Sequence, residues 1–402
     1  MYFDNAATSY PKPNSVLKGI SQFLETESGS SNRSSNTETN DIIYETRSKV
    51  ANLFNVKFPT SIIFTQNSTE ALNLIIKGIL RKGDHVISTA IEHNSVIRPL
   101  IELAKNKIIE LEFVDCDQYG FINQQKVLDK ISDNTKLVVI NHGSNITGSV
   151  QNIDQISKKI GELEKTFLLL DVSQTAGHIT INNEELNADF LAFTGHKGLL
   201  GIQGIGGAYI NPDIPLKPLM VGGTGVLSEL LVQPSGTPLH YEAGTQNGPG
   251  IASLFYSIDY LNKHKISKIS EELFDMTSYF INRLSKFKEL TIYSKPNALW
   301  IVSFNITGIV PARVSHFLLA EFDIVTRSGL MCAPFIHEFI KSGPFGCVRI
   351  SLSDNTQKSE LNHLIDAIIS IVKDSEQSRN VNIPKVYELP SINNWSEELW
   401  IR

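Results

Sequence analysis

The sequence predicts an α/β protein with a mostly parallel sheet, followed by a second, smaller α/β lobe. Between about residues 60 and 210, short β-rich apolar runs alternate with amphipathic helical segments. Such alternation is typical of a parallel sheet covered by helices on both faces. The pattern starts again beyond about residue 251, and 402 residues exceed what one small core supports.

The first region contains a series of predicted strands. They cover residues 62–65, 85–89, 109–114, 137–141, 167–171, 190–194 and 208–210. Amphipathic segments such as 71–80 and 153–163 lie between them and predict the covering helices. Ligands bind at the carboxyl ends of parallel strands, so the residues that follow each run are candidates for a site.

The second half of the chain opens with a Gly/Pro-rich segment, residues 221–250, whose length and lack of periodicity predict a functional or mobile loop. Helical patterns at 251–263 and 270–286 then precede a predicted strand at 299–305. The last strong helical pattern covers 358–372. In the tail, Trp395 and Trp400 are expected to dock on the body of the protein.

Composition excludes several classes of function. The formal charge of −6 and the lack of a Lys/Arg-rich run argue against binding to nucleic acid or to an anionic membrane. No apolar run approaches the roughly 20 residues of a membrane helix, and the first residues lack a signal-peptide pattern. We therefore expect a cytoplasmic protein. Cys116, Cys332 and Cys347 are widely spaced, which argues against a disulfide framework or a zinc site.

Chemically informative residues follow two of the predicted strands. Asp171 ends one apolar run, and Lys197 follows another within Thr194-Gly195-His196-Lys197-Gly198. If both face one pocket, they supply a carboxylate for a pyridinium nitrogen and an amine for an aldehyde, the two groups that a pyridoxal 5'-phosphate (PLP) site requires. The ordinary alternative is a surface lysine and a strand-end aspartate.

A candidate phosphate site follows the strand at 62–65. Gln66-Asn67-Ser68-Thr69-Glu70 opens an amphipathic helix, whose first N–H groups and positive dipole end suit a phosphate. An ordinary helix cap explains the same residues. The chain has neither GxxxxGK[ST] nor a GxGxxG after a strand, which disfavours an ATP or dinucleotide site.

The chain resembles the class V aminotransferase group of fold-type I PLP enzymes over nearly its whole length. Two motifs of this group are Asp171-x-x-Gln174 and Thr194-Gly195-His196-Lys197, and several others accompany them. The closest resemblance is to the cysteine desulfurase and selenocysteine lyase branch. The motifs, in family order, are Tyr2-Phe3-Asp4-Asn5-Ala6-Ala7-Thr8, Asn67-Ser68-Thr69-Glu70-Ala71, Glu92-His93-Asn94, Ser144-Asn145-x-x-Gly148, Glu242-Ala243-Gly244-Thr245, Arg327-x-Gly329-x-x-Cys332-Ala333 and Val348-Arg349-Ile350-Ser351-Leu352.

The resemblance implies a fold-type I PLP-dependent transferase. Its large PLP-binding domain, residues 15–260, would be built on a mostly parallel seven-stranded sheet, and residues 1–14 and 261–402 would form a smaller α/β domain. A homodimer is implied, in which Thr245 reaches the cofactor phosphate of the neighbouring subunit. A small amino-acid substrate and a sulfur-acceptor protein are the other implied partners.

The resemblance also implies a role for each cofactor-binding residue. Lys197 would carry PLP as a Schiff base and move protons, Asp171 would pair with the pyridine nitrogen, and His93 would stack on the ring as part of the catalytic site. Asn145 and Gln174 would hydrogen-bond the phenolic oxygen. The implied phosphate ligands are Ser68, Thr69, Thr194 and His196. Without the resemblance, a satisfied strand-end histidine is the favoured interpretation of His93.

Arg349 would hold the substrate carboxylate, and Ala7 and Asn36 would complete the substrate site. The family usually carries a histidine near the substrate in the region where this chain has Asn36, so the substrate is less firmly implied than the cofactor. Arg349 lies in an apolar strand pattern, where a buried arginine needs an anionic partner in any case. His142, His178 and Cys116 have no link to this site, and we expect them to be structural.

Cys332 matches the catalytic cysteine of the family, and Arg327 nearby could favour the reactive thiolate. The implied reaction converts L-cysteine or selenocysteine to alanine and passes the sulfur to Cys332 as a persulfide. Two alternatives remain open from the sequence. One is a PLP-dependent C–S lyase, aminotransferase or epimerase of a specialised pathway in which Cys332 is incidental. The other is a non-catalytic paralogue that acts as a scaffold.

Overall fold

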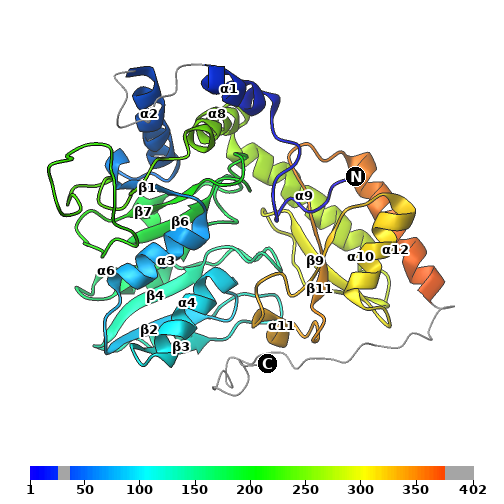
Figure 1. The fold of residues 1–402 in the computed structure, drawn as a ribbon. Helices are drawn as coiled ribbons and strands as arrows, with labels where there is room; N and C mark the ends of the chain where they lie inside the picture. The colour runs from blue at the N-terminus through cyan, green and yellow to red at the C-terminus, as the bar shows by residue number, and fades with distance from the viewer. Residues whose placement is uncertain (26–36, 376–402) are drawn as a thin grey trace.

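The computed structural model describes residues 1–25 and 37–375. Two sheets lie side by side, each with its own helices: a large sheet on the left of Figure 1 and a small one on the right. Asn36, Trp395 and Trp400 lie outside the described residues. Within 1–25 and 37–375, no helix is long and apolar enough to cross a membrane.

The large sheet has seven strands in the order β1-β7-β6-β5-β4-β2-β3. Neighbouring strands from β6 to β3 are parallel, and β7 runs antiparallel to both β1 and β6. The mostly parallel seven-stranded sheet is therefore confirmed. The strands are β1 (Ile62–Thr65), β2 (Asp84–Thr89), β3 (Ile109–Val114), β4 (Thr135–Asn141), β5 (Phe167–Asp171), β6 (Phe190–Thr194) and β7 (Gly206–Ile210).

Strand β4 illustrates why the central strands are apolar along their whole length. Side chains alternate between the two faces of a sheet. Leu137 and Val139 pack into one hydrophobic cluster, and Val138 and Ile140 pack into another on the opposite face. The first cluster includes α3 (Ser68–Ile79) and α4 (Asn94–Lys105), while the second includes α2 (Thr37–Leu53), α6 (Asp154–Gly161) and α8 (Gly248–His264).

The remaining elements of this half are short or peripheral. Helix α1 (Asn14–Glu25) packs on α8 at the top of Figure 1. The 3-10 turn η1 (Pro59–Ser61) precedes β1, and the short helices α5 (Gln124–Leu128) and α7 (Asn183–Leu186) each connect two strands. Residues 211–247 contain no helix or strand, so the predicted long loop is present but ends three residues early, where Asn247 caps α8.

The small sheet has four strands in the order β10-β11-β9-β8, and all its pairs are antiparallel. Its strands are β8 (Leu290–Ile292), β9 (Ile301–Ile306), β10 (Arg327–Gly329) and β11 (Cys347–Ser351). Helices α9 (Ile266–Leu284), α10 (Pro311–Phe322) and α12 (Lys358–Ser375) share a hydrophobic cluster with this sheet, while α11 (Ile336–Phe339) joins the cluster of α3 and α4.

The N-terminal residues join the small sheet rather than the large one, and the N-terminus lies beside it in Figure 1. Tyr2 bridges to Val325 and Asp4 bridges to Ser351, both in parallel orientation. We therefore propose that residues 1–14 belong to the small domain. Helix α8 runs through position 260, so the boundary between residues 260 and 261 stays a prediction.

Candidate active site

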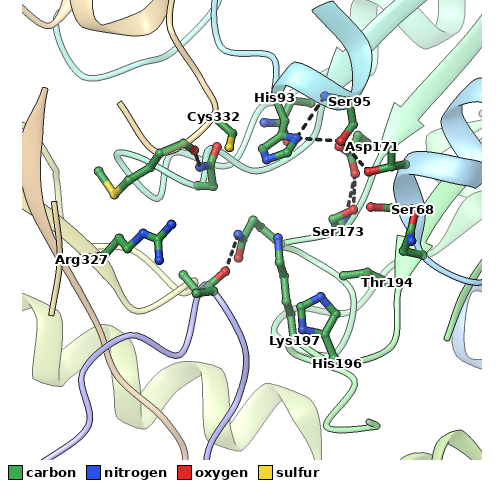
Figure 2. A pocket seen from close by; sticks show the side chains of 18 of the residues that line it. Ser68, His93, Ser95, Asp171, Ser173, Thr194, His196, Lys197, Arg327 and Cys332 are labelled. Atoms are coloured by element: carbon green, nitrogen blue, oxygen red, sulfur yellow. Dashed lines mark hydrogen bonds between the residues drawn. The ribbon is translucent and has the colours of Figure 1, made fainter. Parts of the chain in front are cut away.

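A cavity of about 260 Å³ lies where the carboxyl ends of the parallel strands face the small sheet (Figure 2). Most of the residues predicted from the sequence line it: Ala7, Ser68, Thr69, His93, Asn145, Asp171, Gln174, Thr194, His196, Lys197, Cys332 and Arg349. Asn67 and Arg327 line it as well, and five further lining residues had no predicted role: Ala6, Ser95, Asn141, Ser173 and Met331. The rule that ligands bind at strand ends therefore located the cavity.

Asp171 is the last residue of β5 and is almost completely buried. Ser173 donates to its Oδ1 from both the backbone N at 2.9 Å and Oγ at 2.5 Å. Burial raises the pKa of Asp171, while the Ser173 hydrogen bonds and the charge of Lys197 act in the opposite direction. Ser173 therefore orients the carboxyl group. The Asp-x-Ser spacing, in which an aspartate accepts hydrogen bonds from the residue two positions later, is the sequence signal that could have found this contact.

Lys197 follows β6 and extends into the cavity from below in Figure 2. Burial lowers the pKa of its amine to about 8, although Asp171 opposes this shift. Arg349 lowers the pKa further, because a second cation nearby disfavours the ammonium form. A large share of the amine is therefore neutral near pH 8, the form that attacks a carbonyl group.

The right side of the cavity in Figure 2 suits an anion. Ser68 and Thr69 open helix α3, whose cap is the side chain of Asn67. Thr194 Oγ1 and His196 Nδ1 are buried and have no hydrogen-bond partner within the described residues. Burial lowers the pKa of His196 to about 4, so its ring is neutral. A helix start with unpartnered polar atoms beside it offers hydrogen bonds that a phosphate can satisfy.

His93 caps helix α4, and its Nδ1 accepts a hydrogen bond from Ser95 N at 3.1 Å. Ser95 Oγ lies 2.8 Å from both His93 Nδ1 and Thr69 Oγ1, so one hydroxyl joins the histidine to the start of α3. Burial and the nearby charge of Lys197 lower the pKa of His93 to about 4. The imidazole is therefore a neutral, fixed ring at the wall of the cavity.

Asn145 and Gln174 hold neighbouring main chain with their amide groups. Asn145 Nδ2 donates to Met331 O at 2.9 Å, and Gln174 Nε2 donates to Ala6 O at 3.1 Å. Their amide oxygens are buried without a partner among the described residues. Each NH₂ group has a second hydrogen, so both side chains can still donate to a bound molecule.

Two arginines reach the cavity from the small sheet. Arg349 on β11 is buried, and its Nη2 contacts Asp4 Oδ1 at 2.6 Å while Nη1 donates to Asn145 O at 3.0 Å. Its Nε has no partner within the described residues. Asp4 is thus the anionic partner that the sequence required but did not identify. The Arg327 side chain forms neither a hydrogen bond nor an ion pair with the described part of the chain.

Cys332 is exposed, while Cys116 and Cys347 are buried. The Cys332 backbone has φ of 60°, and its carbonyl accepts a hydrogen bond from Asn94 N at 2.6 Å. Cys332 and Arg327 lie across the cavity from Ser68 and Thr194 (Figure 2). Burial raises the pKa of Cys347 to about 12 and also raises that of Cys116, so neither forms a thiolate near neutral pH.

Thr245 does not line this cavity but a separate one of about 100 Å³. Its loop is anchored by Glu242, whose buried carboxylate pairs with Arg47 through two hydrogen bonds of 2.7 and 2.5 Å. Glu242 also accepts a hydrogen bond from Phe64 N at 2.6 Å. Within one chain, therefore, the structure does not bring Thr245 to the predicted phosphate site.

The sequence profile of the class V aminotransferases matches residues 1–364. The chain belongs to this family. A probable cysteine desulfurase from Pyrococcus abyssi is 33% identical over 94% of this chain and 96% of its own length. One from Methanothermobacter thermautotrophicus is 31% identical over 92% and 94%.

Solved structures of family members share the fold. The apo structure of a cysteine desulfurase from Thermococcus onnurineus is 29% identical, with a TM-score of 0.86 over 93% of this chain and 94% of its own. The cysteine desulfurase CsdA of Escherichia coli has a TM-score of 0.83 at 23% identity, a level that shows the fold alone.

Family membership implies a PLP-dependent enzyme. The cavity fits that cofactor on independent grounds. The unpartnered atoms of Thr194 and His196 lie beside a helix start, as a phosphate requires. A buried carboxyl group and a buried amine of lowered pKa line the same cavity, as the ring nitrogen and the aldehyde require.

The difference in exposure among the three cysteines predicts a labelling pattern. Near neutral pH, an alkylating thiol reagent should modify one cysteine quickly in the folded protein, and peptide mapping should identify it as Cys332. The Cys332→Ala variant should then react at least about tenfold more slowly, because the remaining thiols are buried and of raised pKa. Denatured protein, with all three thiols accessible, is the control. Rapid labelling of Cys116 or Cys347 in the folded protein would contradict this assignment.

Proposed function

We propose that the protein is a PLP-dependent cysteine desulfurase, which converts L-cysteine to alanine and transfers the sulfur to Cys332 as a persulfide. One observation carries the proposal: Lys197, Asp171, Arg349 and Cys332 line a single cavity. An amine, a ring-charging carboxylate, a carboxylate-binding guanidinium and an exposed thiol are the groups that this reaction needs. The relatives named as cysteine desulfurases, which match nearly their whole length, support the same activity.

The residues that would hold the cofactor lie at or just after the carboxyl ends of the parallel strands. Lys197 would bind the aldehyde as a Schiff base, Asp171 would lie at the pyridine nitrogen, and His93 would pack on the ring face. Bound PLP supplies an electron sink next to the α-carbon of an amino acid. The buried carboxyl group of Asp171, oriented by Ser173, would keep the ring nitrogen protonated.

Arg349 would bind the substrate carboxylate through its unpartnered Nε–H and the adjoining Nη2 group. Its contacts with Asp4 and Asn145 hold the guanidinium in place before the substrate arrives. Lys197 would also serve as the base once its amine is free of the cofactor. With a pKa of about 8, this buried amine is suited to remove the α-proton and return it later.

Sulfur transfer would take place at Cys332. Its thiolate attacks the substrate sulfur, an S–S bond forms, and the C–S bond of the substrate breaks. The electron pair of that bond goes to the β-carbon, which takes up a proton and leaves as the methyl group of alanine. The step needs no added oxidant, because sulfur is oxidised as carbon is reduced. Arg327, unpaired among the described residues, would favour the thiolate.

We also propose a homodimer in which Thr245 reaches the site of the neighbouring subunit. The segment before Thr245 exposes a run of large apolar side chains, among them Val221, Leu231 and Val232, as expected of a surface that a second copy covers. A sulfur-acceptor protein would then take the persulfide from the exposed Cys332. The three free thiols suit a reducing compartment such as the cytoplasm.

Incubation with L-cysteine and a thiol reductant tests the reaction. Alanine and sulfide should appear together in equal amounts. Lys197→Ala should lower both by about 100-fold or more, and Cys332→Ala should remove most sulfide release. Cys116→Ala, which changes a thiol outside the cavity, is the control. Unchanged sulfide release by the Cys332 variant, or pyruvate and ammonia in place of alanine, would favour a C–S lyase instead.

The pKa of Lys197 predicts how cofactor binding depends on pH. Only the neutral amine attacks an aldehyde, and a pKa of about 8 places the rise in its neutral fraction around pH 8. An exposed lysine would reach the same state only near pH 10.4. When PLP is added to cofactor-free protein, the rate of growth of the visible imine band should therefore level off above about pH 9. A rate that keeps rising to pH 10 would exclude a desolvated amine at this position.

Mixed dimers test the role of Thr245. Lys197→Ala and Thr245→Ala subunits, each poorly active alone, should regain about half of the wild-type desulfurase activity when they are combined in one dimer. One site of that dimer pairs an intact Lys197 with an intact Thr245 from the other subunit. No recovery, in dimers whose mixed composition is verified by mass spectrometry, would place Thr245 in its own subunit's site. Full activity of Thr245→Ala alone would place it outside any site.

A further inference from the structure

The N-terminal segment Asp4 to Lys12, called the N-terminal strap below, runs past the cavity from the small sheet to the turn that carries Lys197. Its first end is tied to β11, the strand of Arg349. Ser351 N donates to Phe3 O at 2.8 Å, and Ala6 N donates to Ser351 Oγ at 2.8 Å. Asp4 Oδ1 contacts Arg349 Nη2 at 2.6 Å. This end of the strap is therefore fixed to the proposed carboxylate-binding arginine.

The middle of the strap is held on both sides. Gln174 Nε2 donates to Ala6 O, so the large sheet holds the strap where it borders the cavity. Tyr2 OH lies 3.1 Å from both Asp4 O and Thr8 O, which closes the segment into a compact turn. The middle of the strap is therefore a compact turn held by hydrogen bonds on both sides.

The second end of the strap converges on one main-chain carbonyl, that of His196. This oxygen receives Ser9 N at 3.0 Å, Ser9 Oγ at 3.1 Å, Thr8 Oγ1 at 3.2 Å and Lys12 Nζ at 2.9 Å. A carbonyl oxygen has two lone pairs, so four donors are more than it needs. The carbonyl belongs to the peptide group that joins His196 to Lys197.

Lys12 lies at this end without a carboxylate partner within the described residues. Its Nζ has two acceptors there, Ser9 Oγ at 2.7 Å and His196 O. Burial of the amine lowers the pKa of Lys12 to about 8. A largely buried ammonium that has only neutral acceptors costs stability. The position of Lys12 is therefore better explained by its hydrogen bonds to Ser9 and to the His196 carbonyl than by a contribution to the free energy of folding.

We propose that the N-terminal strap sets the position of Lys197 relative to Arg349, with Lys12 and Asp4 as positioning residues at its two ends. Lys12, Thr8 and Ser9 hold the peptide before the lysine, and Asp4 holds the guanidinium that receives the carboxylate. A misplacement of about 1 Å between a catalytic group and its substrate can cost 100-fold in rate. The inference rests on the proposed role of Lys197 as the base.

The exchange of the α-proton of L-alanine in D₂O, followed by NMR with the holoenzyme, isolates this step. It requires Lys197 and the carboxylate site but no sulfur chemistry. In Lys12→Met, the exchange rate at saturating alanine should fall by about 10- to 100-fold. The dissociation constant of alanine, from titration of the visible band, should change less than about twofold. Lys12→Arg, which keeps a donor, should recover most of the rate.

Asp4→Asn should mainly weaken the binding of alanine, whereas Lys12→Met should mainly slow the exchange of its α-proton. The dissociation constant of alanine should rise about tenfold or more, because Arg349 loses its fixed orientation. Binding of ethylamine, which lacks a carboxylate, should remain unchanged. Lys18→Met, which removes an exposed lysine of the neighbouring helix α1, is the matched control and should alter neither quantity.

Failure of the proposed function and failure of the strap's role give different results. Wild-type protein that binds PLP but exchanges no α-proton would overturn the proposed function itself. Normal exchange in Lys12→Met, or equal losses in rate and binding in both variants, would overturn the role of the strap. If Lys12→Met fails to fold, Thr8→Val removes one donor from the same carbonyl and should slow exchange several-fold; an unchanged rate would then reject the proposal.

Discussion

The burial of the Lys197 amine is the constraint on which the rest of the site depends. An ammonium group in a low-dielectric cavity is costly, and burial shifts the equilibrium toward the neutral amine. Two charged neighbours of Lys197 adjust this equilibrium between ammonium and neutral amine. Asp171 partly restores the charged form, while Arg349 opposes it. Their balance leaves an amine that can both attack a carbonyl and move a proton near pH 8.

The same burial keeps several other titratable groups of the site neutral. Burial lowers the pKa of His93 and His196 to about 4, and it raises the pKa of Glu92 to about 8. Glu92 accepts hydrogen bonds from Thr89 Oγ1 and Asn141 N, so it serves as a neutral brace behind the cavity wall. Formal charge is thereby confined to the few groups that would face the cofactor and substrate.

Neither sheet contains the whole site. The large sheet provides the strand ends, the small sheet provides Arg327 and Arg349, and the loop between β10 and α11 provides Cys332. The backbone around Cys332 is held from the large-sheet side by Asn94 N and, at Met331, by Asn145. The N-terminal strap adds a further connection between the two sheets. The relative placement of the lobes therefore determines the distance between amine, guanidinium and thiol.

The local sequence pattern was sufficient to predict the strands and most of the residues that line the cavity. Because side chains of a central strand pack on both faces, runs such as 137–141 are apolar throughout and easy to recognise. Because parallel strands present their carboxyl ends together, Asp171 and Lys197 could be assigned to one cavity before any contact was known. The sequence by itself thus determined the fold class, the family and most of the candidate site residues.

Contacts between distant segments were decided only by the tertiary structure. The Asp4–Arg349 pair joins residues 345 positions apart, and the donors on the His196 carbonyl come from more than 180 positions away. No periodicity encodes such pairings, because they depend on how the two sheets pack and where the chain returns. Desolvation is likewise a property of the packed cavity. A lysine in a sequence has its ordinary pKa, and only enclosure by the other elements lowers it.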